Sequence, residues 1–380
     1  MTAAPRSSLP SPQGAPVAGH LGRWGKEPLT LLEEGAALGE AFELRLWRRA
    51  VVGYSTAWNR TVLGDLDTFR SRGSLSGMTP YLNGGVVMTD PPAHAERRAQ
   101  LNPHFHATAL APLRERLART VDRELPRGSF DTVAWSLRVV PALLNEAFFG
   151  GSFPPALLAH FLAPLHRPLP GPLLPRPVRF ARVRRQIARR MGHAPEGALV
   201  NELAHLPGAA EEVRVSLAAG FDTTSHTLSW ALWFLASHPD ARNQEALPRL
   251  IKETQRLYPA GWLGSRVTSR PFTFEGRTFP RGLLVFYSPY LTHRHPDLWR
   301  NPASFEPDRF ASRPPAWGYI PFAAGPRACL GMHLARMMLE VALEPFLAGT
   351  LEAVDGDPRP RTGLTLAPRG PLQVRWDPRA

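Results

Sequence analysis

The chain has 380 residues, 43% of them hydrophobic, which suffices for one large domain or two smaller ones. Its single cysteine excludes an internal disulfide framework, and no apolar run reaches the length of a membrane span. The formal net charge of +13 comes almost entirely from arginine, since Lys26 and Lys252 are the only lysines. Such a charge attracts acidic proteins, anionic lipids or nucleic acids. The arginines are mostly scattered and no nucleic-acid-binding motif is present, which favours a solvated surface over nucleic-acid binding.

The beginning of the chain differs in composition from the rest. Residues 1–22 are rich in Pro, Ser, Ala and Gly, and they lack the continuous apolar stretch of a secretory signal. We therefore predict a flexible segment over 1–22, a single domain over 23–380 and a cytoplasmic location.

The predicted fold is mainly helical, with short strands near both ends of the chain. Strand-forming residues occur within 41–63, and apolar positions at helical spacing predict a helix over 93–123 that breaks near Pro103. Dense prolines predict a loop over 164–178, and a basic helix follows over 179–191.

The longest predicted helix covers 209–237. Its apolar residues occur on all sides, so it should run through the core. Later in the chain we predict a helix over 241–257, short strands and turns over 265–290, a last apolar helix over 329–348 and short β-hairpins at the C-terminus.

The only cysteine lies in the segment Phe322-Ala-Ala-Gly325-Pro-Arg327-Ala-Cys329-Leu-Gly331. Gly325 permits a tight turn, and Gly331 lets the backbone approach a flat cofactor. Cys329 lies at the start of the last apolar helix, where the helix N-terminus and Arg327 favour a thiolate. The alternative is a buried free cysteine in a glycine loop.

This segment resembles the haem-binding loop of the cytochrome P450 family, F-x-x-G-x-R-x-C-x-G, at every defining position. The resemblance implies a thiolate-ligated haem b, with Cys329 as the iron ligand and with Phe322, Gly325 and Arg327 beside it. A thiolate opposite dioxygen pushes electron density onto the iron and favours cleavage of the O–O bond.

The long helix contains Gly220-Phe-Asp222-Thr223-Thr, a poor choice for helix stability. Hydroxyl bonds to the preceding turn, which merely bend a helix, are one explanation. Ala219 to Thr223 also fits the A-G-x-D/E-T motif of P450s. The resemblance implies that Thr223 hydrogen bonds to bound oxygen, that Asp222 helps to relay protons to it, and that lost backbone bonds near Gly220 open a groove for dioxygen.

Glu253 and Arg256 have the spacing of an ion pair on one helix face, which usually lies at the surface. They also resemble the E-x-x-R motif of P450s. There the pair meets an arginine from a later segment, and Arg309 within Phe305–Phe310 fits that position. The resemblance implies a structural rather than a catalytic triad.

The two propionates of a haem need cationic donors. His94 and Arg98 match the H-x-x-x-R helix of soluble bacterial P450s, Arg266 matches a third donor of the family, and Arg327 supplies a fourth cation. Taken alone, each of these residues would be assigned to a solvated surface. Together and in the family's order they favour haem binding.

The resemblance extends from about Asp90 to the C-terminus and implies the P450 fold, which is mainly α with a smaller β-rich part. It implies a monooxygenase that inserts one oxygen atom of O2 into a C–H bond of a hydrophobic substrate. We expect a monomer that receives electrons from a separate ferredoxin and ferredoxin reductase, because the sequence ends without a flavin or iron–sulfur domain. A basic face suits an acidic ferredoxin.

The substrate pocket is expected to be apolar. The segments 256–262 and 287–293 resemble those of bacterial P450s that hydroxylate carotenoid rings, and also those of fatty-acid hydroxylases of the same branch. A carotenoid or similar isoprenoid is therefore the first choice, and a terpene, fatty acid or polyketide is the alternative. The candidate lining residues are Leu217, Ala219, Gly220, Leu263 and Leu366.

Other interpretations stay open. The basic stretch Arg176–Arg190 could contact a membrane that holds the substrate, although a plain solvated helix is favoured. A peroxide-driven peroxygenase is an alternative function, but peroxygenase relatives typically lack the acid–alcohol pair that Asp222 and Thr223 supply. A haem-binding sensor without chemistry is a third, and the intact oxygen-side motif argues against it.

Overall fold

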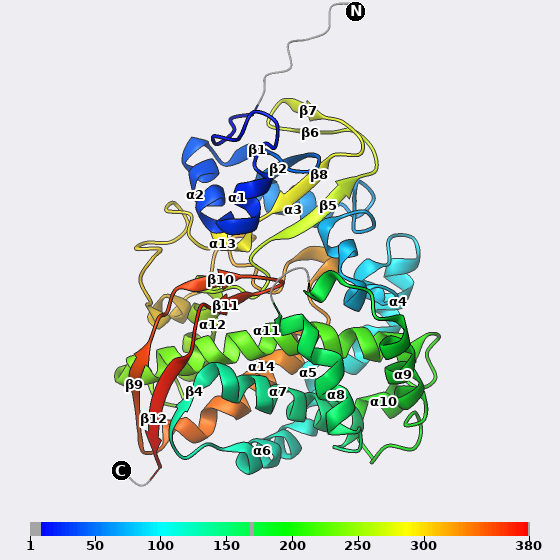
Figure 1. The fold of residues 1–380 in the computed structure, drawn as a ribbon, viewed down its shortest axis with the longest axis vertical. Helices are drawn as coiled ribbons and strands as arrows, with labels where there is room; N and C mark the ends of the chain where they lie inside the picture. The colour runs from blue at the N-terminus through cyan, green and yellow to red at the C-terminus, as the bar shows by residue number, and fades with distance from the viewer. Residues whose placement is uncertain (1–8, 168–170, 379–380) are drawn as a thin grey trace, which may run out of the picture.

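The computed structural model describes residues 9–167 and 171–378. Within these residues the fold is mainly helical, with smaller β-sheets (Figure 1), as the sequence predicts. The β-rich part lies at the end of the molecule where the chain begins, and the long helices fill the other end (Figure 1). No helix in the described part of the chain combines the length and the apolar character needed to cross a membrane.

A five-stranded sheet in the order β1-β2-β8-β5-β3 organises the β-rich part. β2 and β8 are parallel and the other neighbours are antiparallel. The side chains of β8 are all buried, as befits a central strand. The elements of this part are α1 (Leu21–Lys26), α2 (Pro28–Leu38), β1 (Ala41–Arg45), β2 (Arg49–Gly53), α3 (Thr56–Gly64), β3 (Phe69–Arg70), β5 (Gly264–Thr268) and β8 (Leu284–Tyr287).

The described part of the predicted flexible segment, residues 9–22, is attached to β1. The Ser11 hydroxyl donates to the backbone oxygen of Glu43 at 2.9 Å. The backbone N–H of Arg45 donates to Nδ1 of His20, also at 2.9 Å. Residues 1–8 lie outside the described residues, and the boundary at 22 stays a prediction.

Helix α11 (Ala209–Ser237) has the predicted bounds and crosses the middle of the molecule (Figure 1). It contacts α7 (Thr132–Phe149), α9 (Pro177–Ala188), α12 (Leu247–Leu257) and α14 (Met332–Leu343). Most of its residues are buried, as expected of a helix with apolar residues on all sides. The other helices are α4 (Ala93–Leu101), α5 (Ala107–Leu110), α6 (Leu113–Glu124), α8 (Pro155–Leu162), α10 (Leu199–Glu202) and α13 (Pro289–Thr292).

Four predicted helices differ from the observed ones. The basic helix predicted over 179–191 is α9, which spans Pro177–Ala188. The helix predicted over 93–123 is divided into α4, a 3-10 turn that contains Pro103, α5 and α6. The helix predicted over 241–257 begins at Leu247, because the Asn243 side chain accepts the Ala246 N–H at 2.9 Å and forms a turn before it. The last helix begins at Met332, three residues after Cys329.

Short strands complete the fold. The region 41–63 contains β1 and β2 but ends in α3 rather than in a strand, because the Ser55 hydroxyl accepts the Trp58 N–H and begins a helix. The predicted C-terminal hairpins are present as antiparallel pairs. The remaining strands are β4 (Gly128–Asp131), β6 (Phe272–Phe274), β7 (Arg277–Phe279), β9 (Thr350–Gly356), β10 (Pro360–Thr362), β11 (Leu366–Pro368) and β12 (Leu372–Asp377).

Candidate functional site

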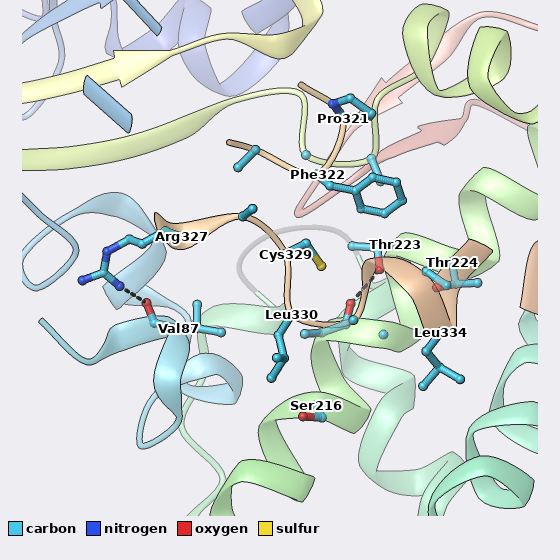
Figure 2. A pocket seen from close by; sticks show the side chains of 18 of the residues that line it. Val87, Ser216, Thr223, Thr224, Pro321, Phe322, Arg327, Cys329, Leu330 and Leu334 are labelled. Carbon is cyan, nitrogen blue, oxygen red and sulfur yellow. Dashed lines mark hydrogen bonds between the residues drawn. The ribbon is translucent and has the colours of Figure 1, made fainter. Parts of the chain in front are cut away.

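A cavity of about 380 Å³ lies between the loop that carries Cys329 and α11. Its wall also includes residues of α4, β5 and α14. Apolar side chains such as Phe105, Leu144 and Phe148 line much of it. Figure 2 shows the Cys329 sulfur on the side of its loop that faces Thr223 and Thr224 of α11. The two motifs that the sequence singled out therefore meet at one cavity.

The cysteine loop is held by backbone contacts. The Cys329 N–H donates to the backbone oxygen of Phe322 at 2.9 Å, which closes the loop. Gly325 adopts φ +67°, and a Cβ atom there would lie 2.5 Å from the backbone oxygen of Leu63. Only glycine fits this left-handed turn against α3. Phe322 lines the cavity, and the guanidinium of Arg336 lies 5.2 Å from its ring centroid.

The Cys329 side chain is accessible because it lines the cavity. Burial within the surrounding protein raises the pKa of its thiol, while the Gly331 backbone N–H and the nearby Arg98 and Arg336 act in the opposite direction. A Cβ added at Gly331 would meet no atom within 4 Å. The backbone here leaves open space beside the sulfur, as a flat cofactor requires.

Three arginines line the cavity: Arg98, Arg266 and Arg327. Arg327 forms an ion pair with Asp90 at 2.6 Å. In each of the three, the Nε atom is buried and has no hydrogen-bond partner among the described residues. Buried donors in proteins are usually satisfied, so three unsatisfied guanidinium donors around one cavity indicate a site for an anionic ligand.

His94 lies among these arginines and also lines the cavity. Burial, together with the positive charges of Arg327, Arg98 and Arg266, lowers its pKa from 6.5 to about 4, against the opposing effect of Asp90. His94 is therefore neutral at pH 7 and can donate a hydrogen bond without adding charge. The structure brings together all four of the residues predicted to bind propionates.

One face of α11 forms the opposite part of the wall. Ser216, Ala219, Gly220, Thr223 and Thr227 line the cavity at helical spacing. The Thr223 hydroxyl donates to the backbone oxygen of Ala219 at 2.6 Å. The helix is continuous from residue 209 to 237. The predicted loss of backbone bonds near Gly220 is therefore wrong, because the hydroxyl bonds back without displacing the helix ladder.

Asp222 points away from the cavity. Its carboxylate accepts a hydrogen bond from the Thr365 hydroxyl at 2.7 Å and lies within 3.8 Å of ring nitrogens of His166 and His226. Burial tends to raise its pKa, but His226, His166 and Thr365 outweigh that effect and the pKa is lowered. Asp222 is therefore ionised at neutral pH. Thr223 lines the cavity and Asp222 does not, so the proton-relay role predicted for Asp222 would have to act through its neighbour.

The predicted triad forms away from the cavity. Glu253 and Arg256 are both fully buried and pair at 2.7 Å, and Arg309 reaches the same carboxylate at 3.0 Å. Arg256 also donates to the backbone oxygens of His293, at 2.8 Å, and Pro302, at 2.7 Å. The three side chains thus tie α12 to the segment that precedes the cysteine loop.

The predicted substrate-pocket residues separate into two groups. Ala219, Gly220 and Leu263 line the cavity. Leu217 and Leu366 do not, and that part of the prediction is wrong. Leu217 lies about 100° around α11 from the cavity-lining Ser216 and is buried in the helical core. Leu366 is buried in the core of the β-rich part.

Other cavity residues were missed by the sequence analysis. Glu212, Ser216, Thr224 and Thr227 lie on the cavity face of α11, and their spacing from Gly220 and Thr223 was available as a signal. His166, which does not line the cavity but lies beside Asp222, could not have been found this way, because it belongs to a separate turn far from α11 in the sequence. Among the described residues, His166, Asp222 and His226 form the group whose spacing could hold a metal ion.

Comparisons with known proteins agree with this site. Residues 205–247 and 242–349 match the family described as Cytochrome P450. The chain is 27% identical to cyclooctatin synthase of Streptomyces melanosporofaciens, over 97% of this chain and 95% of that protein. It is 34% identical to cytochrome P450 3A2 of Rattus norvegicus over 34% of this chain and 31% of that protein.

A solved structure gives the same result for the whole fold. The crystal structure of a 6-coordinated cytochrome P450 from Thermus thermophilus is 25% identical and has a TM-score of 0.79, covering 92% of this chain and 98% of that one. The sequence match and the fold agree over nearly the full chain. The chain belongs to the cytochrome P450 superfamily, whose members are monooxygenases that carry a thiolate-ligated haem.

Proposed function

We propose that this chain binds haem b in the cavity through Cys329 and inserts one oxygen atom of O2 into a C–H bond of an apolar substrate. The observation that carries the proposal is the convergence on one cavity of the only cysteine and three arginines. Each of these arginines has a buried Nε atom without a hydrogen-bond partner among the described residues. A haem has one iron that accepts a thiolate and two propionates that accept hydrogen bonds. The residues present fit both of these needs.

The cationic residues hold the propionates. Arg98, Arg266 and Arg327 line the cavity and each has an Nε donor without a partner among the described residues, and neutral His94 adds a further donor. Phe322 and Gly331 shape the wall beside the sulfur. A thiolate-ligated haem supplies the activation of dioxygen when it is bound. The protein excludes water from this chemistry with the apolar wall formed by α7 and α14.

Thr223 and Asp222 have different tasks in the proposed reaction. The Thr223 hydroxyl lines the cavity and now donates to Ala219, so it can rotate to bond oxygen. The ionised Asp222, one residue earlier, accepts protons that enter from the far side of α11. Because this acid–alcohol pair is intact, a monooxygenase driven by O2 is favoured over a peroxygenase.

The cavity wall supports an uncharged substrate. Its positively charged residues in the described chain are the three arginines assigned to the propionates. No further cation among the described lining residues is left for the carboxylate of a fatty acid. An isoprenoid hydrocarbon needs no such partner, and the apolar side chains of the wall suit it.

The electron donor is proposed to be a ferredoxin with its reductase. The net charge of +13 favours an acidic protein, and electrostatic attraction raises the rate at which such partners associate.

The membrane contact proposed for Arg176–Arg190 rests on α9, where Val178 is 80% exposed amid several arginines.

The decisive test is a difference spectrum of the reduced protein with and without carbon monoxide. Purified protein loaded with haem should show the long-wavelength band that gives the family its name. Product formation from O2, NADPH, a ferredoxin and its reductase is then measured with a carotenoid, a terpene and a fatty acid. Turnover with hydrogen peroxide but none with O2 and electrons would overturn the monooxygenase proposal in favour of a peroxygenase.

Loss of one propionate donor should weaken haem binding. We expect Arg266→Ala to lower haem affinity about ten-fold or more, because a hydrogen bond to a charged group contributes about 1.5–3 kcal/mol. Transfer of haem to apomyoglobin measures this loss. Arg270→Ala, on an exposed arginine two residues after the end of β5, should leave the transfer rate unchanged. Equal rates for both variants would contradict the assignment.

Removal of the Thr223 hydroxyl should uncouple the reaction. In Thr223→Ala we expect product per O2 consumed to fall about ten-fold or more, while hydrogen peroxide release rises. Thr223→Ser should restore coupling. Ser237→Ala removes a hydroxyl with the same back-bond at the exposed end of α11 and serves as the control. Unchanged coupling in Thr223→Ala would refute its role.

A further inference from the structure

Four side chains on the far side of α11 form a continuous chain of hydrogen bonds. His166 Nδ1 lies 3.1 Å from His226 Nε2. His226 Nδ1 lies 2.7 Å from the Thr365 hydroxyl, which donates to Asp222 at 2.7 Å. This hydrogen-bond network joins three separate parts of the fold. His166 ends a turn after α8, Asp222 and His226 belong to α11, and Thr365 lies in the loop between β10 and β11.

The hydrogen bonds in this network can be oriented in only one direction. Asp222 is ionised, so the single proton of the Thr365 hydroxyl points to its Oδ2. His226 must then donate from Nδ1 to Thr365, which leaves its Nε2 as an acceptor. His166 in turn must donate from Nδ1 to His226. Every donor along the chain thus points inward toward Asp222.

The hydrogen-bond network also leads from solvent to the interior of the protein. The His166 side chain is 34% exposed, whereas those of His226 and Asp222 are 3% and 7% exposed. Asp222 directly precedes Thr223, whose side chain lines the cavity. The network is therefore open to solvent at His166. Its inner end, Asp222, lies one residue from Thr223 at the candidate oxygen site.

The electrostatic surroundings favour transfer of a proton through His226 over a stably protonated His226 ring. Burial lowers the pKa of His226 to about 4; Asp222 opposes this change, and His166 and Arg361 reinforce it. His226 is therefore neutral at pH 7. A proton that reaches it moves on to the Thr365–Asp222 pair, which carries the negative charge.

We propose that His166, His226 and Thr365 form the route by which solvent protons reach Asp222 for oxygen reduction. The inference rests on the proposed monooxygenase function. Insertion of one oxygen atom while the other becomes water consumes two protons and two electrons, and the electrons come from the redox partner. The proton route is an assignment for this chain's own residues beyond the acid–alcohol pair.

Each transfer conserves atoms and charge. A solvent proton binds to Nε2 of His166, and the Nδ1 proton of that ring passes to Nε2 of His226. The Nδ1 proton of His226 passes to the Thr365 oxygen, whose own proton passes to Asp222. One proton is gained by the carboxylate, no bond between heavy atoms changes, and rotation of the rings and hydroxyl restores the chain.

Thr365→Val tests the route, since it removes the hydroxyl and keeps the shape of the side chain. We expect product formation with O2 and electrons to fall about ten-fold or more, and the solvent deuterium isotope effect on that rate to rise. Product formation with hydrogen peroxide should stay at the wild-type level, because peroxide brings its own protons. His166→Ala should behave in the same way, and Thr365→Ser should restore the O2-driven rate.

His160→Ala is the matched control, because His160 is an exposed histidine six residues before His166 and lies outside the chain. Its O2-driven rate and isotope effect should equal those of the wild type. If Thr365→Val and His166→Ala also keep the wild-type rate and isotope effect, the route is refuted. Absence of both the carbon monoxide band and any product in the wild-type protein would instead refute the proposed function.

A second readout does not depend on turnover. In reduced, carbon monoxide-bound holoenzyme labelled with ¹⁵N-histidine, His226 should be neutral with its proton on Nδ1, and Nδ1 of His166 should carry a proton. The Thr365→Val variant should shift the His226 Nδ1 resonance, since that atom loses its acceptor. A wild-type His226 with its proton on Nε2 would overturn the proposed direction of the chain.

Discussion

Cys329→Ser is expected to abolish the long-wavelength carbon monoxide band. The chain has no other thiol that could replace this ligand. Burial raises the pKa of the Cys329 thiol, so the positive charge of bound iron is what makes the thiolate stable at neutral pH. A serine hydroxyl in the same place stays protonated and cannot push electron density onto the iron as a thiolate does. Turnover with O2 should be lost together with the band.

Loss of the ligand must be distinguished from loss of the cofactor. Arg98, Arg266 and Arg327 remain in the variant, so some haem should still bind through its propionates. Total haem is measured after denaturation in pyridine and alkali, and the carbon monoxide spectrum is divided by that amount. Persistence of the wild-type band per haem in Cys329→Ser would refute the assignment of this residue.

The sequence predicted the site best where a local pattern sets the geometry. The bounds of α11 follow from a long, largely apolar stretch that His238 and Pro239 end. The turn at Gly325 follows from the glycine itself, since its left-handed φ and its approach to Leu63 leave no room for a side chain. Pairing of Glu253 with Arg256 follows from their spacing on one helix face.

The sequence was less informative where packing decides which way a side chain points. Helical spacing shows that Asp222 and Thr223 lie about 100° apart, but not which of them faces the cavity. That choice depends on how α11 lies against α7 and α14. Leu217 was placed in the pocket for the same reason, although it faces the helical core.

The proton route is the part of the site that the sequence could least predict. His226 is one turn after Asp222 and could have been noticed from spacing alone. His166 and Thr365 come from a turn and a hairpin that touch α11 only in the folded protein. No motif links them, and a proline-dense stretch around His166 predicted only a loop.

Glu253→Gln is expected to cost about 3–5 kcal/mol of unfolding free energy, the usual effect of removing one partner of a buried ion pair. Arg256 is fully buried, and its guanidinium pairs with Glu253 through both Nε and Nη2, at 2.7 and 2.8 Å. Glu253 also accepts the backbone N–H of Glu306 at 2.9 Å and the side chain of Arg309. The amide keeps the shape of the side chain and removes its charge, which leaves Arg256 without a counter-ion.

Urea unfolding followed by tryptophan fluorescence measures this loss in the holoenzyme. Glu115→Gln is the control, because Glu115 pairs with Arg119 at the same kind of short helical spacing while both side chains are more than 60% exposed. An exposed pair contributes little, so the control should change stability by less than about 0.5 kcal/mol. The haem spectrum of folded Glu253→Gln should match the wild type, since the triad does not line the cavity. An altered spectrum with unchanged stability would show that the triad acts on the haem and not on the fold.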